Sequence, residues 1–231
     1  MNGVSSYVLI PAYNEAGMIG SVVERVPEQC DTIRVVDDGS TDGTGACARE
    51  AGAVVLSHGD NEGKGEALKT GFRDFLDGSW EYLVMLDADG QHDPGKIPYL
   101  LEEILASNEA LLIGSRTSRL DDLPGIRPYT NKLLRIFISG LVGQVIGDTQ
   151  SGFRVLTRDT VRELTLTGSS FELESEMIIE AGLNGLSIGE REVGLPRMPG
   201  ADSKWNPVED YYRIIRLLFH YYTGGLVTKP V

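Results

Sequence analysis

Three clusters of acidic and small polar residues in the first hundred positions have the composition of a ligand site. Each follows a short apolar run, and they read Pro11-Ala12-Tyr13-Asn14-Glu15, Asp37-Asp38-Gly39-Ser40 and Asp87-Ala88-Asp89-Gly90-Gln91. One such cluster alone is typical of a turn, because Asp, Gly and Ser are ordinary turn residues. Three of them together are unusual, since like charges held close cost free energy unless a cation or a hydrogen-bond donor offsets them. We therefore expect the clusters to form one site.

The third cluster has the spacing of a metal site. Asp87 and Asp89 stand two apart just after an apolar run, and residues i and i+2 of an extended backbone face the same side. Two carboxylates directed at one point suit Mg²⁺ or Mn²⁺, which take oxygen ligands and complete their shell with substrate phosphate. Gln91 continues the same face and is a third candidate ligand, whereas we interpret His92 as a turn residue. The sequence thus predicts a divalent metal held by Asp87, Asp89 and Gln91.

Three better-known motifs do not explain these residues. The segment that begins at Asp38 resembles an EF-hand loop, but its twelfth position is Arg49 instead of glutamate. A near match to a dinucleotide fingerprint begins at Gly43, where the neighbouring carboxylates would repel a pyrophosphate. Lys64 does not belong to a P-loop, because Gly65 follows it where Ser or Thr is required.

The clusters are positioned by an alternation of apolar runs and helical patterns. The runs are rich in Val, Ile and Leu without strict alternation, as in parallel strands buried on both faces. The expected strands are residues 7–10, 33–37, 53–57, 82–86 and 111–114, and the expected helices are 16–26, 45–51, 65–75 and 95–106. This order predicts a doubly wound α/β sheet, and ligands of such sheets bind beyond the carboxyl ends of the strands.

The second half of the chain shows a less regular pattern. It is expected to contain helices at 132–146, 172–183 and 208–222, strands at 153–156 and 186–193, and a loop at 196–204.

Composition and charge exclude several classes of protein. The 231 residues are 41% hydrophobic and 24% charged, as in ordinary folded domains. A net charge of −13 disfavours a nucleic-acid-binding protein. Cys30 and Cys47 are too few for a disulfide framework, and we interpret them as reduced thiols of a cytosolic protein. We expect no signal peptide, because the first ten residues lack a positively charged segment and are expected to enter a strand. We expect no membrane span, because the longest uncharged apolar stretches have 12 residues and about 20 are needed.

Two segments of this acidic chain are neutral to basic and apolar. Residues 124–147 carry Arg127, Lys132 and Arg135 and no acidic residue, and the segment from Trp205 onward holds four of the nine tyrosines. They are either two core helices or a surface that lies on a membrane, with aromatic rings at the headgroups and basic residues toward anionic lipid.

In chain order, the motifs resemble those of the family 2 inverting glycosyltransferases, which have the GT-A fold. The resemblance rests on residues 10–15 (IPAYNE), 35–40 (VVDDGS), 63–68 (GKGEAL) and 87–91 (DADGQ). Residues 114–116 (GSR), 148–154 (DTQSGFR), 171–176 (FELESE) and 203–204 (SK) are similar to the polyprenyl-phosphate branch, which includes the dolichyl-phosphate mannosyltransferases. The resemblance covers about residues 5–215.

This resemblance implies a domain organisation and a set of ligands. A GT-A catalytic domain would span 1–204, with a nucleotide-binding half at 1–115 and an acceptor half at 116–204, and an amphipathic helix and tail would follow at 205–231. The ligands would be a nucleotide-diphospho-sugar of the GDP-mannose or UDP-glucose type, a polyprenyl phosphate, and Mg²⁺ or Mn²⁺. The protein would lie peripherally on the cytoplasmic face of the membrane. Its oligomeric state stays open.

The resemblance also implies roles for individual residues. Pro11, Tyr13 and Glu15 would line the nucleotide pocket, with Lys64 facing the nucleotide. Asp38 would accept a hydrogen bond from the base, with Val36 packed nearby. The residues that would hold the metal and the diphosphate are Asp87, Ala88, Asp89 and Gln91. Those that would bind or close over the phosphates are Arg116, Arg127, Arg197 and Lys204. The expected catalytic residues are Asp89, Arg116, Arg127 and Lys204.

The acceptor decides which further residues are needed. In an inverting transfer the acceptor displaces the nucleoside diphosphate in line, and the metal offsets the charge that the leaving group gains. A polyprenyl phosphate is already anionic and needs cations instead of a base, for which Arg116, Arg127, Arg154 and Lys204 are candidates. A hydroxyl acceptor would need a carboxylate base, for which the candidates are Glu172, Glu174 and Glu176. A soluble GT-A enzyme with a hydroxyl acceptor, a nucleotide-sugar-binding protein without turnover and a nucleotidyltransferase are the alternatives.

Overall fold

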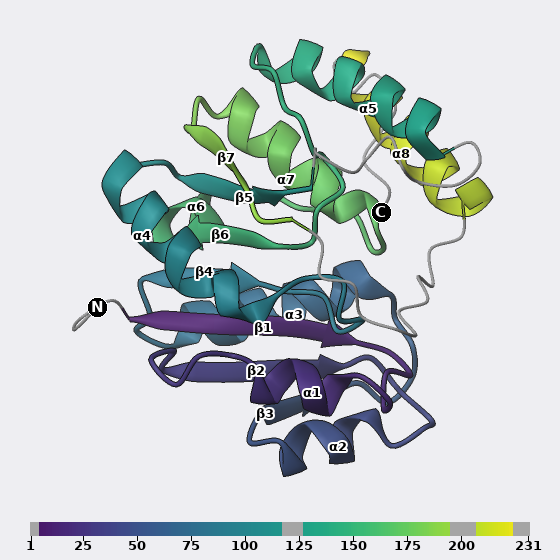
Figure 1. The fold of residues 1–231 in the computed structure, drawn as a ribbon. Coiled ribbons are helices and arrows are strands. Elements are labelled where there is room, and N and C mark those ends of the chain that lie inside the picture. The colour runs from purple at the N-terminus through teal and green to yellow at the C-terminus, as the bar shows by residue number, and fades with distance from the viewer. Residues whose placement is uncertain (1–4, 117–126, 195–206, 224–231) are drawn as a thin grey trace.

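The computed structural model describes residues 5–116, 127–194 and 207–223, and a seven-stranded sheet lies at its centre (Figure 1). The strands are β1 (Ser6–Ala12), β2 (Thr32–Asp37), β3 (Val54–Ser57), β4 (Tyr82–Met85), β5 (Leu111–Ser115), β6 (Arg154–Thr157) and β7 (Ile188–Glu192). Their order is β3-β2-β1-β4-β6-β5-β7. All paired strands are parallel except β6, which is antiparallel to both β4 and β5. The prediction of a mostly parallel α/β sheet is confirmed.

Helices cover both faces of the sheet. One face carries α1 (Ile19–Glu24), α2 (Thr44–Glu50) and α4 (Ile97–Ser107), the last preceded by the 3₁₀ turn η1 (Pro94–Lys96). The other carries α3 (Lys64–Asp77), α6 (Arg158–Glu163) and α7 (Glu172–Leu183). Outside α7 lie α5 (Arg127–Val142) and α8 (Pro207–Tyr222), side by side in Figure 1.

The central strand β1 shows why both faces are covered. Val8 and Ile10 belong to the core beneath α1, α2 and α4, whereas Tyr7 and Leu9 belong to the core beneath α3 and α7. All four are fully buried. Successive residues of a strand point to opposite faces, so an unbroken apolar run requires a layer on each side.

Two features fix the position of α3, whose first residue is Lys64. A Cβ atom at Gly71 would lie 2.2 Å from Leu9 Cδ1, so the glycine allows the helix to pack closely on β1. At the C-terminal end of α3, the last carbonyl groups have no N–H partner within the helix. Arg158 donates hydrogen bonds there to four backbone oxygens, those of Phe75, Leu76, Gly78 and Trp80.

The second half departs from the predicted boundaries. The helix expected at 132–146 is α5, which begins five residues earlier and ends before Gly143, a residue in the left-handed region at φ +68°. The helix α6 was not predicted, because its sequence RDTVRE has a single apolar residue. The helix α7 has the predicted bounds. The predicted loop at 196–204 lies outside the described residues. Within the ranges that the structure describes, no helix is long and apolar enough to cross a membrane.

Candidate active site

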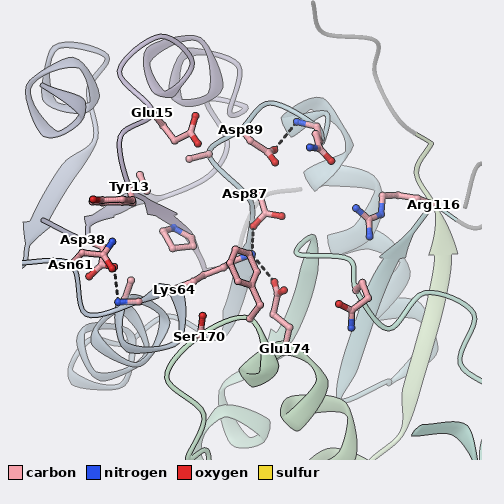
Figure 2. A pocket seen from close by; sticks show the side chains of 18 of the residues that line it. Tyr13, Glu15, Asp38, Asn61, Lys64, Asp87, Asp89, Arg116, Ser170 and Glu174 are labelled. Atoms are coloured by element: carbon pink, nitrogen blue, oxygen red, sulfur yellow. Dashed lines mark hydrogen bonds and ion pairs between the residues drawn. The ribbon is translucent and has the colours of Figure 1, made fainter. Parts of the chain in front are cut away.

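A pocket of about 410 Å³ opens where β1, β2 and β4 end (Figure 2). The chain leaves β1 for β2 on one side and returns to β4 on the other, and such a switch point is where α/β sheets bind ligands. The pocket brings together most of the predicted residues: Pro11, Tyr13, Glu15, Asp38, Lys64, Asp87, Ala88, Asp89, Gln91 and Arg116. Segments outside the predicted set contribute Asn61, Asn131, Gln150, Ser170 and Phe171.

Several sequence-predicted residues lie elsewhere. Val36 is fully buried in the core beneath α3 and does not line the pocket. Arg127 begins α5, and its side chain is not among those described; Arg197 and Lys204 lie outside the described residues.

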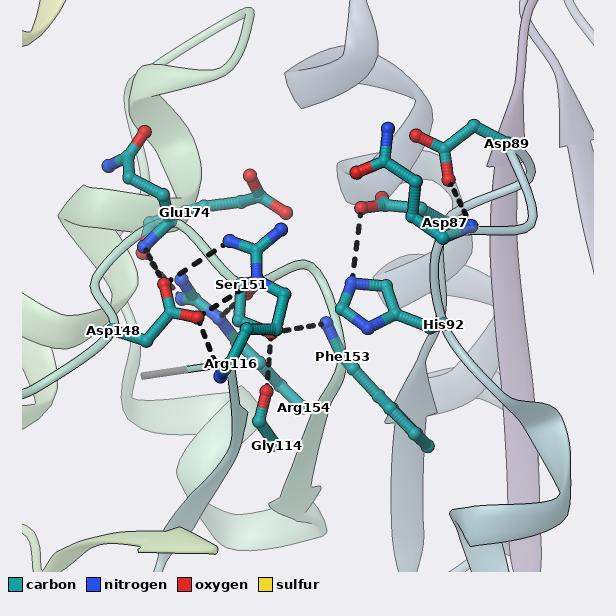
Figure 3. A network of polar contacts seen from close by, with 12 residues as sticks. Asp87, Asp89, His92, Gly114, Arg116, Asp148, Ser151, Phe153, Arg154 and Glu174 are labelled. Carbon is teal, nitrogen blue, oxygen red and sulfur yellow. Dashed lines mark hydrogen bonds and ion pairs between the residues drawn. The ribbon is translucent and has the colours of Figure 1, made fainter. Parts of the chain in front are cut away.

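The candidate Arg154 is not available to an acceptor phosphate, contrary to expectation. Its guanidinium is fully buried and donates to the backbone oxygens of Thr149, Ser151 and Glu174. It holds the 148–154 loop against α7, as Figure 3 shows.

The three candidate bases on α7 separate into two kinds. Glu172 accepts hydrogen bonds from the backbone N–H groups of Ser169 and Ser170 at the start of the helix. Glu176 accepts from those of Thr167 and Gly168. Both carboxylates therefore hold the loop before α7. Of these three, Glu174 lines the pocket.

One end of the pocket is formed by Asp38, directly after β2. Its side chain is 3% exposed and is held by three donors within the described residues: His58 Nδ1 at 2.7 Å, Glu62 N at 3.0 Å and Gly63 N at 2.8 Å. Gly39 allows this arrangement, because at φ +70° a Cβ atom there would lie 2.3 Å from the Asp60 carbonyl carbon. The turn after β2 and the loop before α3 thus close around one carboxylate.

The other end of the pocket carries a group of three charged residues, Lys64, Asp87 and Glu174. Lys64 Nζ lies 2.6 Å from Asp87 Oδ1 and 3.0 Å from Glu174 Oε1. Burial by itself lowers the pKa of Lys64, but the charges of Asp87 and Glu174 outweigh it and raise that pKa. The pKa of Asp87 is held well below its usual range, because Lys64 and then His92 outweigh its burial.

Asp89 shows the opposite behaviour to Asp87. Burial and the neighbouring charge of Asp87 raise the pKa of Asp89 to about 6, against a weaker lowering by the Gln91 N–H that it accepts. The site therefore contains more negative charge than its own donors offset.

The backbone at Asp87 and Asp89 is not extended, so the prediction that they face the same side as residues i and i+2 of an extended chain is wrong. β4 ends at Met85, and residues 88–90 form a turn with Gly90 at φ +73°. The turn nevertheless places Asp87, Asp89 and Gln91 on the same pocket. Close packing with the 148–154 loop also matters, since a Cβ atom at Gly152 would lie 2.2 Å from Asp87 Oδ2.

His92 lies in a bend, as expected of a turn residue, but its side chain is an interior one. Its ring is fully buried, packs edge-on against Phe153, and lies with Nε2 3.8 Å from Asp87 Oδ2 (Figure 3). Neither ring nitrogen has a hydrogen bond within the described part of the chain. Burial, and then the charge of Arg116, lowers the pKa of His92 to about 4. Nothing in the local sequence distinguishes such a histidine from a turn histidine.

Arg116 is fixed on the wall opposite Asp38. Asp148, which is 1% exposed, accepts from its Nε at 2.9 Å, its Nη2 at 3.2 Å and its backbone N–H at 3.0 Å. This paired geometry holds a planar cation at the pocket wall.

The donor set at Asp87 and Asp89 fits a divalent metal that shares its shell with phosphate. Within the described ranges, no three His, Cys, Asp or Glu side chains form a metal cluster by themselves. Two carboxylates and the Gln91 amide are oxygen donors of the kind that Mg²⁺ and Mn²⁺ use, with the remaining positions left to water and substrate. Burial and the charge of Asp87 raise the pKa of Asp89, so a bound cation would stabilise the ionised form of this carboxylate.

Comparisons with known proteins agree with this geometry. The model of "Glycosyl transferase family 2" matches residues 7–165. The chain is 31% identical to the UDP-N-acetylglucosamine–dolichyl-phosphate N-acetylglucosaminyltransferase of Methanococcus voltae, over 80% of this chain and 82% of that protein. It is also 31% identical to the polyprenol monophosphomannose synthase of Mycolicibacterium smegmatis, over 84% and 81%.

A solved structure shares the fold. Glucosyl-3-phosphoglycerate synthase from Mycobacterium tuberculosis, in complex with Mn²⁺, uridine diphosphate and phosphoglyceric acid, superimposes with a TM-score of 0.76 over 99% of this chain and 80% of that one, at 21% identity. The expected GT-A fold is confirmed.

Proposed function

The chain belongs to glycosyl transferase family 2 and is a glycosyltransferase, and we propose that it transfers a hexose with inversion from a nucleotide-diphospho-sugar to a polyprenyl phosphate, using Mg²⁺ or Mn²⁺. Two of its relatives are named for transfer to dolichyl phosphate or to a polyprenol. A structure of the same fold contains Mn²⁺ and uridine diphosphate. Neither of these two relatives is named for transfer to the hydroxyl acceptor of the soluble alternative.

The pairing of Lys64 with Glu174 is the observation that carries the choice of acceptor. Of the three candidate bases on α7, Glu174 lines the pocket, and its carboxylate accepts from Lys64 Nζ at 3.0 Å. A hydroxyl acceptor needs a base whose oxygen can take a proton. A phosphate needs no base, and the fixed guanidinium of Arg116 suits it. These contacts support an acceptor that arrives as an anion.

The mechanism follows from this arrangement. An acceptor phosphate oxygen forms a bond to the anomeric carbon as the bond to the donor diphosphate breaks, and the electron pair leaves with the diphosphate. A metal ion held by Asp87 and Asp89 would supply positive charge to that leaving group. Asp38 holds the base and Arg116 orients phosphate. We keep Arg127, Arg197 and Lys204 as proposed further cations of the acceptor half.

We also propose that the pair α5 and α8 rests on the membrane that holds the acceptor. Each helix has a core face, with Leu134 and Ile138 or Ile214 and Leu218 buried. Each also has exposed apolar side chains: Leu133, Ile136, Phe137, Tyr212, Ile215, Phe219 and Tyr222, exposed by 41–67%. The two helices are joined by the Phe137 and Tyr222 rings and by a hydrogen bond from Tyr222 Oη to the Phe137 carbonyl. On this proposal both sequence interpretations of these segments would apply, one to each face of the helix pair.

Vesicle binding tests this membrane face. The double substitution Ile136→Asp and Phe219→Asp is expected to weaken binding to anionic vesicles by at least about tenfold, because it places charge where apolar surface would be buried. Transfer to a long polyprenyl phosphate should fall with it, and transfer to a short, water-soluble one should not. Val54→Asp with Leu105→Asp is the matched control, since both side chains are exposed to a similar extent elsewhere. Equal binding by the two double variants would contradict the proposal.

A donor panel tests the activity itself. GDP-mannose, UDP-glucose and UDP-N-acetylglucosamine are each supplied with Mn²⁺ and a short polyprenyl phosphate, and the product is analysed by mass spectrometry. We expect a polyprenyl-phospho-sugar from at least one donor. Transfer only to hydroxyl acceptors would overturn the choice of acceptor.

A further inference from the structure

The carboxylate of Asp38 has most of its hydrogen-bonding capacity occupied by the protein. His58 Nδ1 and Glu62 N share Oδ1, and Gly63 N donates to Oδ2. An ionised carboxylate has about four lone-pair sites. Among the described residues, three are therefore filled, and one site on Oδ2 is left for a ligand.

His58 is the residue that closes Oδ1. A carboxylate accepts only, so Nδ1 is the nitrogen that donates, and Nε2 of a neutral ring then accepts from the Thr70 hydroxyl at 2.9 Å. The side chain of His58 is 10% exposed and that of Asp38 is 3% exposed. Because both ends of the imidazole are bonded, Oδ1 is not free to turn toward the pocket.

The surroundings of this one remaining site suit a planar heterocycle. The Tyr13 side chain, 38% exposed, and Pro11 line the same pocket, and Figure 2 shows Tyr13 and Asn61 at the same end as Asp38. A ring held against these groups would present its edge to Asp38.

The number of N–H groups on that edge distinguishes the bases. Guanine presents two adjacent donors, N1–H and the 2-amino group, which pair with both oxygens of a carboxylate. Uracil presents one, N3–H, between two carbonyl oxygens. Adenine and cytosine place a ring nitrogen lone pair next to their amino group, and it would face the carboxylate. With one acceptor site available, guanine would leave a buried donor unpaired, which is costly.

We infer that the donor of this enzyme is a uridine diphosphate sugar, and that His58 acts as a specificity-determining residue by occupying the second oxygen of Asp38. The inference rests on the proposed function, since it assigns the base of that nucleotide.

Calorimetry with Mn²⁺ and nucleoside diphosphates tests it. UDP is expected to bind at least about tenfold more tightly than GDP, and UDP methylated at N3 is expected to lose at least about tenfold against UDP. GDP binding as tightly as UDP, or N3-methyl-UDP binding as tightly as UDP, would overturn the inference and leave the proposed function in place. Failure of every nucleotide to bind would instead defeat the proposed function.

The variant His58→Phe tests the role of the histidine. It frees an acceptor site on Oδ1, so the preference for UDP over GDP should narrow by at least about threefold. His220→Phe, the same substitution on α8 away from the pocket, should leave the ratio unchanged. An unchanged ratio in a folded His58→Phe protein would overturn the assignment of His58. If that variant does not fold, the N3-methyl comparison on the unaltered protein decides.

Discussion

The two ends of the pocket use carboxylates in opposite ways. At one end, Asp38 is held by three N–H donors, all from neighbouring loop residues. At the other, among the described residues, Lys64 Nζ donates to Asp87 and Gln91 N donates to Asp89, and His92 Nε2 lies 3.8 Å from Asp87 Oδ2. The protein itself satisfies the first carboxylate and leaves the second pair with excess negative charge. A satisfied carboxylate is a fixed template for a neutral group, whereas an under-compensated pair is a place for a cation.

Removing a carboxylate from the under-compensated end is expected to have the largest effect. Asp89→Ala should lower kcat for transfer by at least about a thousandfold, because the site then loses a ligand for the metal that stabilises the leaving diphosphate. Radiolabelled sugar transfer with saturating Mn²⁺ measures this effect.

The matched control for that variant is Asp93→Ala. Asp93 lies four residues further on, pairs with Arg25 and caps η1 outside the pocket, so its loss should leave kcat within a few fold. Full activity of Asp89→Ala with Mn²⁺ would contradict a metal site at the Asp87 and Asp89 end of the pocket.

The same kind of change at the satisfied end should have a smaller effect of a different kind. Asp38→Asn replaces one of the two accepting carboxylate oxygens with an NH₂ group, which donates. The variant should weaken binding of the nucleoside diphosphate by about 10- to 100-fold. It should also lower the melting temperature, because the N–H groups of Glu62, Gly63 and His58 lose acceptor capacity.

Asp37→Asn provides the comparison for this variant. Asp37 is the last residue of β2 and is also buried, but it accepts from Ser40 N and does not line the pocket. Both variants should therefore lose stability, and only Asp38→Asn should lose nucleotide affinity. Equal affinities for the nucleotide would place Asp38 among ordinary turn residues.

Some residues of the site could be predicted from the sequence, and others could not. The residues at the strand ends, from Pro11 to Gln91, were identified because each cluster is local and follows an apolar run. His58 was not, since its pairing with Asp38 depends on how the chain packs twenty residues later. The burial of His92 and of Arg154 was not predicted, for the same reason. Polar residue types indicate chemistry, but burial and partners arise from contacts between distant segments.

The sheet itself was largely predictable, and its second half less so. Parallel strands buried on both faces produce apolar runs that stand out, and all five strands of the first half were found. α6 and the start of α5 lack a clear apolar period, so packing against α3 and α7 decides their limits.

The last prediction concerns stability and its dependence on pH. The folded-state pKa of Asp89 is raised to about 6, above the unfolded value of about 3.9. Between these values the folded protein binds more protons at this group than the unfolded chain, so stability from Asp89 falls as pH rises from about 4 to 6.

Asp89→Asn removes this titration and keeps the shape and the acceptor for Gln91 N. Without metal, the variant should match the unaltered protein near pH 4 and melt several degrees higher at pH 8, on the order of 1–3 kcal/mol. Removing the charge of Asp89 also removes its repulsion of the Asp87 carboxylate, and this acts on stability in the same direction. Scanning calorimetry in chelator measures the difference; adding Mn²⁺ with nucleoside diphosphate should reverse the order, because only the unaltered protein gains a ligated metal. A variant that melts below the unaltered protein at pH 8 in chelator would mean that Asp89, like Asp38, is satisfied by the protein alone.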